Sequence, residues 1–442
     1  MNAPLTLREW SYLPIREGGE EGSLLPAEAD RLHAVAQAAE RDLRLGSGES
    51  DKVLQHHKTR IRAQQVVGVL AAPGVAVEIL PKIDDQSDEA VRHVLVEMLA
   101  QAFNLPIAPG RLAELSRQHR HLLEIVIGLF CELVFRVVHR GLPRAYVGQM
   151  ADLPSLRGRL DVHRQFGVLA ASPQKLACHF DELSSDILPN RILKTAINRL
   201  RRQSSAPRNQ RQLAELDFML EDIRPFAPGE PIPFQDLVLD RTNERLRAPL
   251  EIARFLIEGS YQTTSSGHGR GFALLFEMNT LFEEFVGRAA QRVSGRHGAR
   301  VHLQGPRSHV LNRESDGRAL FATKPDIYWS HAAADILVDT KWKRLDASDS
   351  EGRMGVSQGD IYQMMAYAHV YPARRLILLY PHIAALRKPA GIQVRFRISG
   401  TDKILEIATI DVARPDLVPA QFSVLMQGRL DDGEDPRVGT AA

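Results

Sequence analysis

Residues 324–343 read KPDIYWSHAAADILVDTKWK, and this stretch decides how the chain is interpreted. It holds two apolar runs, each about five residues long, which are typical of buried strands. The first run carries Asp326, and the second ends in the triplet Asp339-Thr340-Lys341. Acids and a lysine at the ends of neighbouring strands indicate the centre of a metal-dependent nuclease.

The chemistry expected of these side chains follows from their charge and their order. Carboxylates on adjacent strands can hold Mg²⁺, which prefers oxygen ligands and keeps waters for the reaction. Asp326 and Asp339 are therefore expected to be metal ligands. Strand side chains alternate between faces, so Lys341 should share a face with Asp339, while Thr340 points away and offers only its backbone carbonyl. Lys341 can then orient or deprotonate a metal-activated water and neutralise developing charge.

The flanking pattern predicts an α/β domain around a mixed sheet. Apolar residues at helical spacing predict one helix over Phe272–Val293, which carries Glu283 on its flank. Asp326 is expected inside a strand. The four predicted strands are Arg300–Gln304, Ala319–Trp329, Asp335–Trp342 and Arg375–Tyr380.

A second helix is expected over Ser357–Val370, just before the last strand. Its spacing places Asp360, Gln363 and Tyr367 on one face, so Gln363 can reach a water or the DNA backbone. Taken singly, a Pro-Asp pair or an Asp-x-Lys triplet is more often a turn acid or a surface ion pair. Their joint placement between two helices favours the catalytic interpretation.

The 442 residues are too many for one ordinary domain. Two β-branched runs, Ile61–Leu70 and Val75–Leu80, flank Pro73-Gly74 and predict a hairpin. Leu122–Val138 is expected to be a buried helix, and the breaker-rich stretch 225–233 to join two domains. We expect an α+β multidomain protein with a β-rich N-terminal region, 1–86, a helical middle domain, 87–225, a C-terminal α/β nuclease domain, 234–415, and a tail, 416–442.

Bulk properties set limits on the partners and the compartment. The formal net charge is only +2, from 56 Lys and Arg against 54 Asp and Glu, so any phosphate-binding surface must be local. Two cysteines, Cys131 and Cys178, are too few for a disulfide framework and fit a reducing cytoplasm. The N-terminus lacks the order of a signal peptide, and no apolar run reaches the ~20 residues that span a bilayer. We expect a cytoplasmic protein without a membrane partner.

Several motifs in the chain, taken together, resemble those of the PD-(D/E)xK nuclease superfamily. Their order over about residues 60–415 is similar to that of the McrC family, the nuclease subunits of McrBC modified-cytosine restriction systems. The motifs that carry this resemblance are Val67-Gly68-Val69, Glu78–Ile83, Gly158–Val162, the pair Asp181-Glu182, Asn190–Lys194, Asn279–Val286, Lys324–Ile327, Asp339–Lys343 and Asp360–Tyr367.

The resemblance implies a Mg²⁺-dependent endonuclease that cuts double-stranded DNA containing modified cytosine. It makes Asp326 and Asp339 metal ligands, Lys341 the catalytic lysine, Glu283 a helix carboxylate near the metal and Gln363 an accessory polar residue. It also implies that the N-terminal region docks into the pore of a hexameric McrB-like AAA+ GTPase and stimulates its hydrolysis. The resemblance implies no nucleotide site in this chain, which has no Gly-x-x-x-x-Gly-Lys-Ser/Thr run.

Two other functions stay open from the sequence alone. The chain can be a catalytically inactive nuclease fold that serves as scaffold and activator of the motor. It can also be a stand-alone repair or phage-defence nuclease, although its near-neutral charge argues against strong DNA binding by itself. Nicking by the complex and cutting by the isolated chain distinguish these functions.

Overall fold

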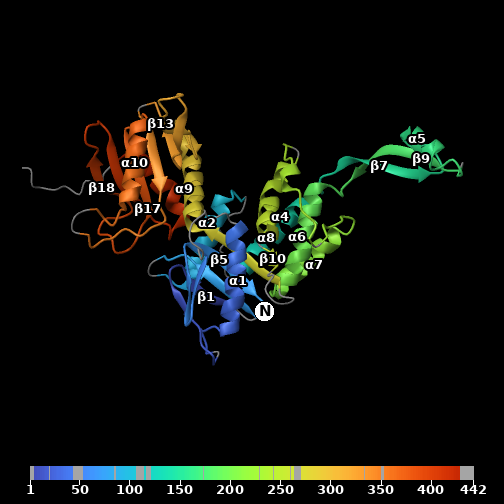
Figure 1. Cartoon of the computed structure of the whole chain (residues 1–442), viewed down its shortest axis with the longest axis horizontal. Helices are drawn as coiled ribbons and strands as arrows, with labels where there is room; N and C mark the ends of the chain where they lie inside the picture. The colour runs from blue at the N-terminus through green and yellow to red at the C-terminus, as the bar shows by residue number, and fades with distance from the viewer. Residues whose placement is uncertain are drawn as a thin grey trace, which may run out of the picture. The chain divides into compact units, whose positions relative to one another are not determined.

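The computed structural model describes residues 4–18, 20–42, 53–83, 86–105, 114–115, 121–172, 174–227, 229–241, 243–258, 260–262, 270–332, 334–349 and 353–428 (Figure 1). The chain is a mixed α/β protein with several sheets. It divides into two compact units, Met1–Leu122 with Tyr261–Ala442, and Leu123–Ser260. Within the described ranges, no helix is both long and apolar enough to cross a membrane.

A five-stranded sheet begins the first unit. Its order is β1-β6-β5-β11-β10, with bounds Leu5–Arg8, Val75–Leu80, Val66–Ala72, Arg270–Glu277 and Ser260–Gln262. The predicted hairpin is confirmed for β5 and β6, because Ala72 pairs with Val75 across Pro73-Gly74. The first predicted run, Ile61–Leu70, is divided, because Arg60–Ala63 form β4 of another sheet. Helix α1 (Pro26–Asp42) shares one apolar core with this sheet and with a small sheet of order β2-β4-β3, which comprises Tyr12–Pro14, Arg60–Ala63 and Leu54–His57.

The single helix predicted over Phe272–Val293 is wrong in its first part. Residues 270–277 form strand β11, which pairs antiparallel with β5, and helix α9 begins only at Met278 and ends at Ser294. Strand β11 lies between β5 and β10, and Phe272, Ala273 and Leu274 are all buried. A strand buried on both faces is apolar at every position, and such a run imitates a helical stripe. Strands β10 and β11 fall inside the region predicted as nuclease domain, yet they complete the N-terminal sheet.

Gly68 is where β5 and β11 approach most closely. Its φ is +134°, and a Cβ placed there would overlap the carbonyl oxygen of Leu274. We expect Gly68→Ala to lower the free energy of unfolding by about 3 kcal/mol or more, since it adds backbone strain to a clash with backbone atoms. Gly74→Ala is the matched control: its φ is +83°, but only the end of the Arg31 side chain lies near. Denaturant unfolding measures both, and equal losses would contradict the packing argument.

A six-stranded mixed sheet forms the other part of the first unit. Its order is β12-β15-β16-β17-β19-β18, with bounds Arg300–Leu303, Ile327–Ser330, Ile336–Thr340, Arg375–Pro381, Ile404–Ile410 and Gly391–Arg397. Strands β16, β17 and β19 run parallel, whereas β15 is antiparallel to β16. The predicted mixed sheet is thus confirmed.

Helices cover this sheet on both faces (Figure 1). Helix α10 (Gln358–Val370) packs in one core with Tyr328 and Leu337, while Trp329, which points the other way, contacts Phe422 of α11 (Val418–Gln427). Helix α2 (Asp88–Ala102) packs on α9. The sequence predicted α10 to within one residue, and Ser357 caps its first turn.

The single strand predicted over Ala319–Trp329 is also wrong. Residues 319–323 form β14, which pairs with β13 (Ser308–Asn312) in a separate two-stranded sheet, and β15 begins only at Ile327. Asp326 therefore precedes a strand instead of lying inside one. Pro325 supplies no N–H for a ladder, and the carbonyls of Pro325 and Asp326 accept hydrogen bonds from Gly305 and Gln304 instead.

The second unit contains helices and a sheet. Its helices are α4 (Leu122–His139, whose first residue belongs to the first unit), α5 (Val162–Phe166), α6 (Leu188–Gln203), α7 (Pro207–Met219) and α8 (Arg247–Glu258). The predicted helical middle domain has these helices, but it also contains a three-stranded sheet that the prediction did not include, formed by β7 (Ala145–Leu153), β9 (Leu176–Ser184) and β8 (Arg159–Leu160). Short 3-10 helices complete the described chain at Phe234–Asp236, Glu244–Leu246, Gly295–His297 and Pro415–Leu417.

Candidate active site

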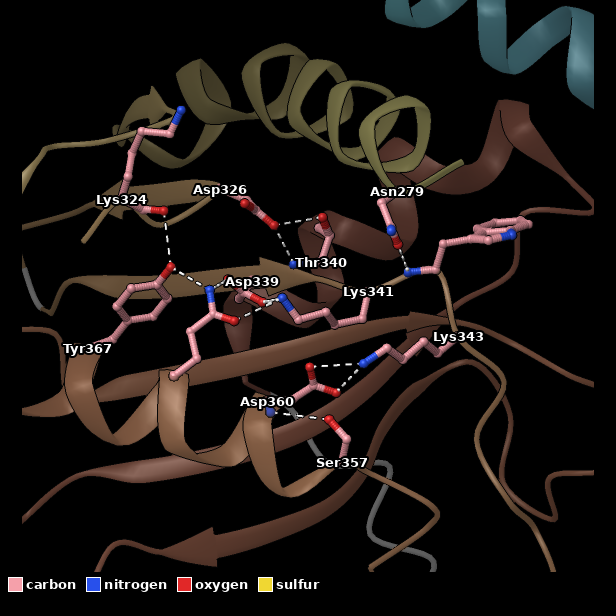
Figure 2. A network of polar contacts seen from close by, with 12 residues as sticks. Asn279, Lys324, Asp326, Asp339, Thr340, Lys341, Lys343, Ser357, Asp360 and Tyr367 are labelled. Atoms are coloured by element: carbon pink, nitrogen blue, oxygen red, sulfur yellow. Dashed lines mark hydrogen bonds and ion pairs between the residues drawn. The ribbon is translucent and has the colours of Figure 1, made fainter. Parts of the chain in front are cut away.

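The end of β16 and the start of β15 lie side by side, because the two strands are antiparallel and Ile327 pairs with Val338. This register brings Asp326 next to Thr340. The backbone N–H and the hydroxyl of Thr340 both donate to Oδ2 of Asp326, at 2.7 and 2.8 Å (Figure 2). The sequence assigned Thr340 no side-chain role, whereas in the structure its hydroxyl fixes one of the two acids.

Asp339, Lys341 and Gln363 form one bonded network. Lys341 Nζ lies 2.5 Å from Asp339 Oδ2 and donates to Gln363 Oε1 at 3.1 Å. Gln363 Nε2 donates to Asp339 Oδ1 at 3.0 Å and to the Tyr367 hydroxyl at 2.8 Å. Gln363 and Tyr367 thus share the face of α10 that the sequence predicted. Asp360 has a different role, because it pairs with Lys343 at 2.9 Å (Figure 2).

Three carboxyl groups near these strand ends have raised pKa values. Burial raises the pKa of Glu283 to about 8, and the charge of Asp326 adds to the rise. Burial and then Asp326 raise the pKa of Asp339 to about 6, although Lys341 opposes them. Burial raises the pKa of Asp326, against hydrogen bonds from Thr340. Burial lowers the pKa of Lys341, but the Asp339 carboxylate more than offsets this and the net pKa is raised. The raised pKa values of the three carboxyl groups and of Lys341 mean that the site favours binding of positive charge, either protons or a cation.

The donor set fits a hard cation. Within the described residues, Asp339 Oδ2 is buried and accepts no hydrogen bond of normal geometry, so the ammonium of Lys341 is its partner. No group of three or more His, Cys, Asp or Glu side chains suited to a metal occurs in the described part of the chain. Mg²⁺ is commonly held by one or two carboxylates, with waters and phosphate oxygens completing its shell, so two acids suffice.

Sequence reasoning missed a second group of polar residues behind the site. Asn279, at the start of α9, accepts from the backbone N–H of Trp342 at 3.3 Å and from Gln65 at 2.9 Å. The indole N–H of Trp342 donates to both carboxylate oxygens of Glu9, at 2.9 and 3.1 Å. A buried tryptophan N–H needs an acceptor, so the position of Trp342 signalled that one exists, without indicating which.

Glu9 is expected to make stability depend on pH. Burial raises its pKa from 4.5 to about 7, despite the hydrogen bond from Trp342. A raised carboxyl pKa contributes stability below pH 4.5, and this contribution is lost as the pH rises to about 7. In the wild-type chain, Glu9 should therefore lower the free energy of unfolding by about 3 kcal/mol between pH 4.5 and 8. Glu9→Gln should lack this decrease. Denaturant unfolding at several pH values measures it, with exposed Glu314→Gln as control; an unchanged pH profile for Glu9→Gln would refute the assignment.

The family of the chain follows from a sequence match. Residues 61–381 match the model of the McrBC 5-methylcytosine restriction system component family. The chain belongs to this family. The McrBC family predicted from the motifs is thus confirmed, and the match spans the strand ends that carry Asp326 and Asp339.

Relatives of known identity agree with this placement in the McrBC family. The type IV methyl-directed restriction enzyme EcoKMcrBC of Escherichia coli K12 is 21% identical over 314 residues, which is 68% of this chain and 84% of the relative. Two solved structures from Thermococcus gammatolerans are similar in fold. McrC bound to McrB AAA+ hexamers gives a TM-score of 0.71 at 21% identity, covering 96% of this chain and 100% of that chain. The McrBC complex solved by cryo-EM gives a TM-score of 0.53 at 26% identity, covering 66% and 88%.

Proposed function

We propose that this chain is the DNA endonuclease subunit of a GTP-dependent restriction complex that acts on DNA containing modified cytosine. The observation that carries the proposal is the network of Asp339, Lys341 and Gln363 beside Asp326, in a chain of the McrBC family. Scaffolds that perform no chemistry gain nothing from a buried acid whose pKa is raised, because burying charge costs stability. A catalytic cation would offset that cost.

The chemistry divides among the side chains at the strand ends. Held by Asp326 and Asp339, Mg²⁺ would supply an activated water and charge neutralisation at the phosphodiester. Lys341 keeps its proton on Nζ, because Asp339 favours the ammonium form, so it stabilises negative charge developing on the phosphate oxygens. Gln363 bonds to both Asp339 and Lys341 and holds them in one orientation. Glu283 adds a further carboxyl near Asp326.

The proposed partner is a hexameric McrB-like AAA+ GTPase, and a similar Thermococcus structure holds McrC bound to McrB AAA+ hexamers. The sequence placed the docking surface in residues 1–86. In the structure, four large apolar side chains of the second unit are exposed. Tyr146 and Met150 on β7 are 74% and 65% exposed, and Phe166 at the end of α5 and Val168 in the turn after it are 75% and 77% exposed. Such patches mark protein contacts, so we assign the ribbon to the partner as well (Figure 1).

Cutting by the reconstituted complex tests the function. The full chain with an McrB-like hexamer should cut DNA containing 5-methylcytosine only when GTP and Mg²⁺ are both present, and each component alone should not. Robust cutting by the isolated chain would identify a stand-alone nuclease instead. GTPase stimulation without nicking under any divalent metal would identify an inactive scaffold.

The ribbon contact has its own test. Phe166→Ser with Val168→Ser should reduce stimulation of the partner's GTP hydrolysis at least about tenfold, since central apolar contacts carry most interface energy. Val424→Ser, which removes a side chain 55% exposed on α11, is the control and should change nothing. Stimulation that survives the double substitution would return the docking surface to the N-terminal region.

A further inference from the structure

A cavity of about 450 Å³ is lined by residues that directly follow Lys341 in the chain. Trp342 and Lys343, which directly follow Lys341, form one side, and Glu9, Trp10 and Lys82 of the N-terminal part form another. His382 and Val412 line it from the segments that follow β17 and β19. The cavity thus lies past the carboxyl ends of parallel strands, where α/β sheets place ligands. Its volume is in the range of small-ligand sites.

Two indoles line this cavity, and one has an unusual backbone. Trp10 is 39% exposed and has φ 63°, a conformation that bulky residues rarely adopt. Its backbone is fixed by a hydrogen bond from Trp10 N–H to the Ala63 carbonyl at 3.1 Å, and Arg62 lies 5.4 Å from its ring centre. The other indole, Trp342, donates to both carboxylate oxygens of Glu9. A strained, partly exposed aromatic held in this way suggests a surface built for stacking.

The charged residues of the cavity are mainly cations. Lys82, Lys343 and Arg344 line it and are exposed, whereas the acid among its lining residues, Glu9, is 2% exposed and accepts hydrogen bonds from the Trp342 indole. Lys343 also pairs with Asp360 at the end of α10 nearest to Ser357. Cations around an aromatic platform are the combination that binds single-stranded nucleic acid, with phosphates on the lysines and bases on the rings.

We propose that this cavity receives one unpaired nucleotide of the DNA strand beside the cut, with its base stacked on Trp10 and its phosphate held by Lys82 and Lys343. The inference rests on the proposed endonuclease function and adds a strand-binding site to it. Taking a base out of the stack costs free energy that stacking on the indole and the phosphate contacts offset. The strand would then be fixed next to Lys341, because Trp342 and Lys343, which follow this lysine, line the cavity.

Binding of a labelled short oligothymidylate to the full chain, followed by anisotropy in EDTA, tests the site. Trp10→Ala should weaken binding about five- to a hundredfold, the range for loss of one stacked base, and Trp10→Phe should keep most of it. Phe396→Ala removes a similarly exposed aromatic, 41%, outside the cavity and should have no effect. Lys82→Ala should lower the slope of log affinity against log salt by about 0.7, as loss of one phosphate contact does.

Tryptophan emission reports the location of the bound strand, because Trp10 and Trp342 line the cavity while Trp329 is buried against α11. Oligothymidylate should quench the wild-type emission. Unchanged emission, or wild-type affinity in both Trp10→Ala and Lys82→Ala, overturns the proposal. Thymidine monophosphate that binds as tightly as the oligonucleotide also overturns it, since the site would then serve a free nucleotide. If Trp10→Ala fails to fold, the proposal is tested by the salt dependence of oligothymidylate binding in Lys82→Ala and by the quenching of wild-type tryptophan emission.

This test separates the strand site from the proposed function. The assay contains no free divalent metal, so it does not depend on cutting. A reconstituted complex that nicks no DNA under any divalent metal would defeat the endonuclease function and leave the binding result standing. Wild-type oligonucleotide binding by both Trp10→Ala and Lys82→Ala would defeat the strand site and leave the endonuclease function standing.

Discussion

The Asp339→Asn substitution is expected to lower the rate of DNA cutting by the reconstituted complex by about 10³-fold or more. The carboxylate oxygen Oδ2 of Asp339 is buried and its partner is Lys341. The asparagine amide that replaces this carboxylate carries no charge to hold a cation. Gln363 donates to Oδ1, a bond that the asparagine oxygen can keep. The change therefore removes the charge and preserves the shape. Single-turnover cutting of methylated DNA measures the effect.

The fold should survive this substitution. The raised pKa of Asp339, about 6, means that its charged form costs stability above that pH in the metal-free chain. The neutral amide avoids this cost, so the thermal midpoint of Asp339→Asn at pH 8 should be unchanged or higher, and stimulation of the partner's GTP hydrolysis should persist. A lower midpoint would show that the lost cutting reflects unfolding.

Lys341→Met is expected to reduce cutting by about 10²- to 10³-fold, the usual effect of removing one charge-stabilising donor. The ammonium at Nζ bonds to Asp339 and Gln363, and methionine fills a similar volume without the charge. Lys388→Met serves as the control, because Lys388 is a lysine of the same unit that donates to a backbone carbonyl, that of Gln393. Full cutting by Lys341→Met would remove this lysine from the mechanism.

Stability should respond to Lys341→Met in the opposite sense from Asp339→Asn. Without the ammonium, the buried Asp339 carboxylate loses the partner that lowers its pKa, so the pKa rises further. We expect a loss of up to about 3 kcal/mol in unfolding free energy at pH 8. The loss should shrink as the pH falls, because protonation removes the unpaired charge. Denaturant unfolding at pH 8 and at a lower pH checks this.

The residues of the site that could be predicted from the sequence are those fixed by the order of neighbouring strands and by helical spacing. Asp326 and Asp339 flank two short apolar strands separated by a short segment, and such strands pair as neighbours, so their ends meet. Helical spacing likewise placed Gln363 and Tyr367 on one face of α10, and both reach the strand ends. These predictions needed only periodicity and chain order.

The remaining contacts depend on tertiary packing that no local pattern records. The Glu9–Trp342 pair joins residues 333 positions apart, and Gln65–Asn279 joins residues 214 apart. Strand β11 was mistaken for helix because both of its faces are covered. The β7–β9 ribbon was missed because only Ala177 and Cys178 of these two strands are buried, so neither strand carries the apolar run of a core strand.

Mapping the metal in the protein tests the central claim most directly. Fe²⁺ replaces Mg²⁺ in the wild-type chain, ascorbate and peroxide generate hydroxyl radicals at the bound ion, and mass spectrometry locates the backbone breaks. The expected result is cleavage beside Asp326 and beside Asp339–Lys341, lost in Asp339→Asn. Breaks elsewhere in the chain, or a pattern that Asp339→Asn leaves unchanged, would contradict a cutting centre at the ends of β15 and β16.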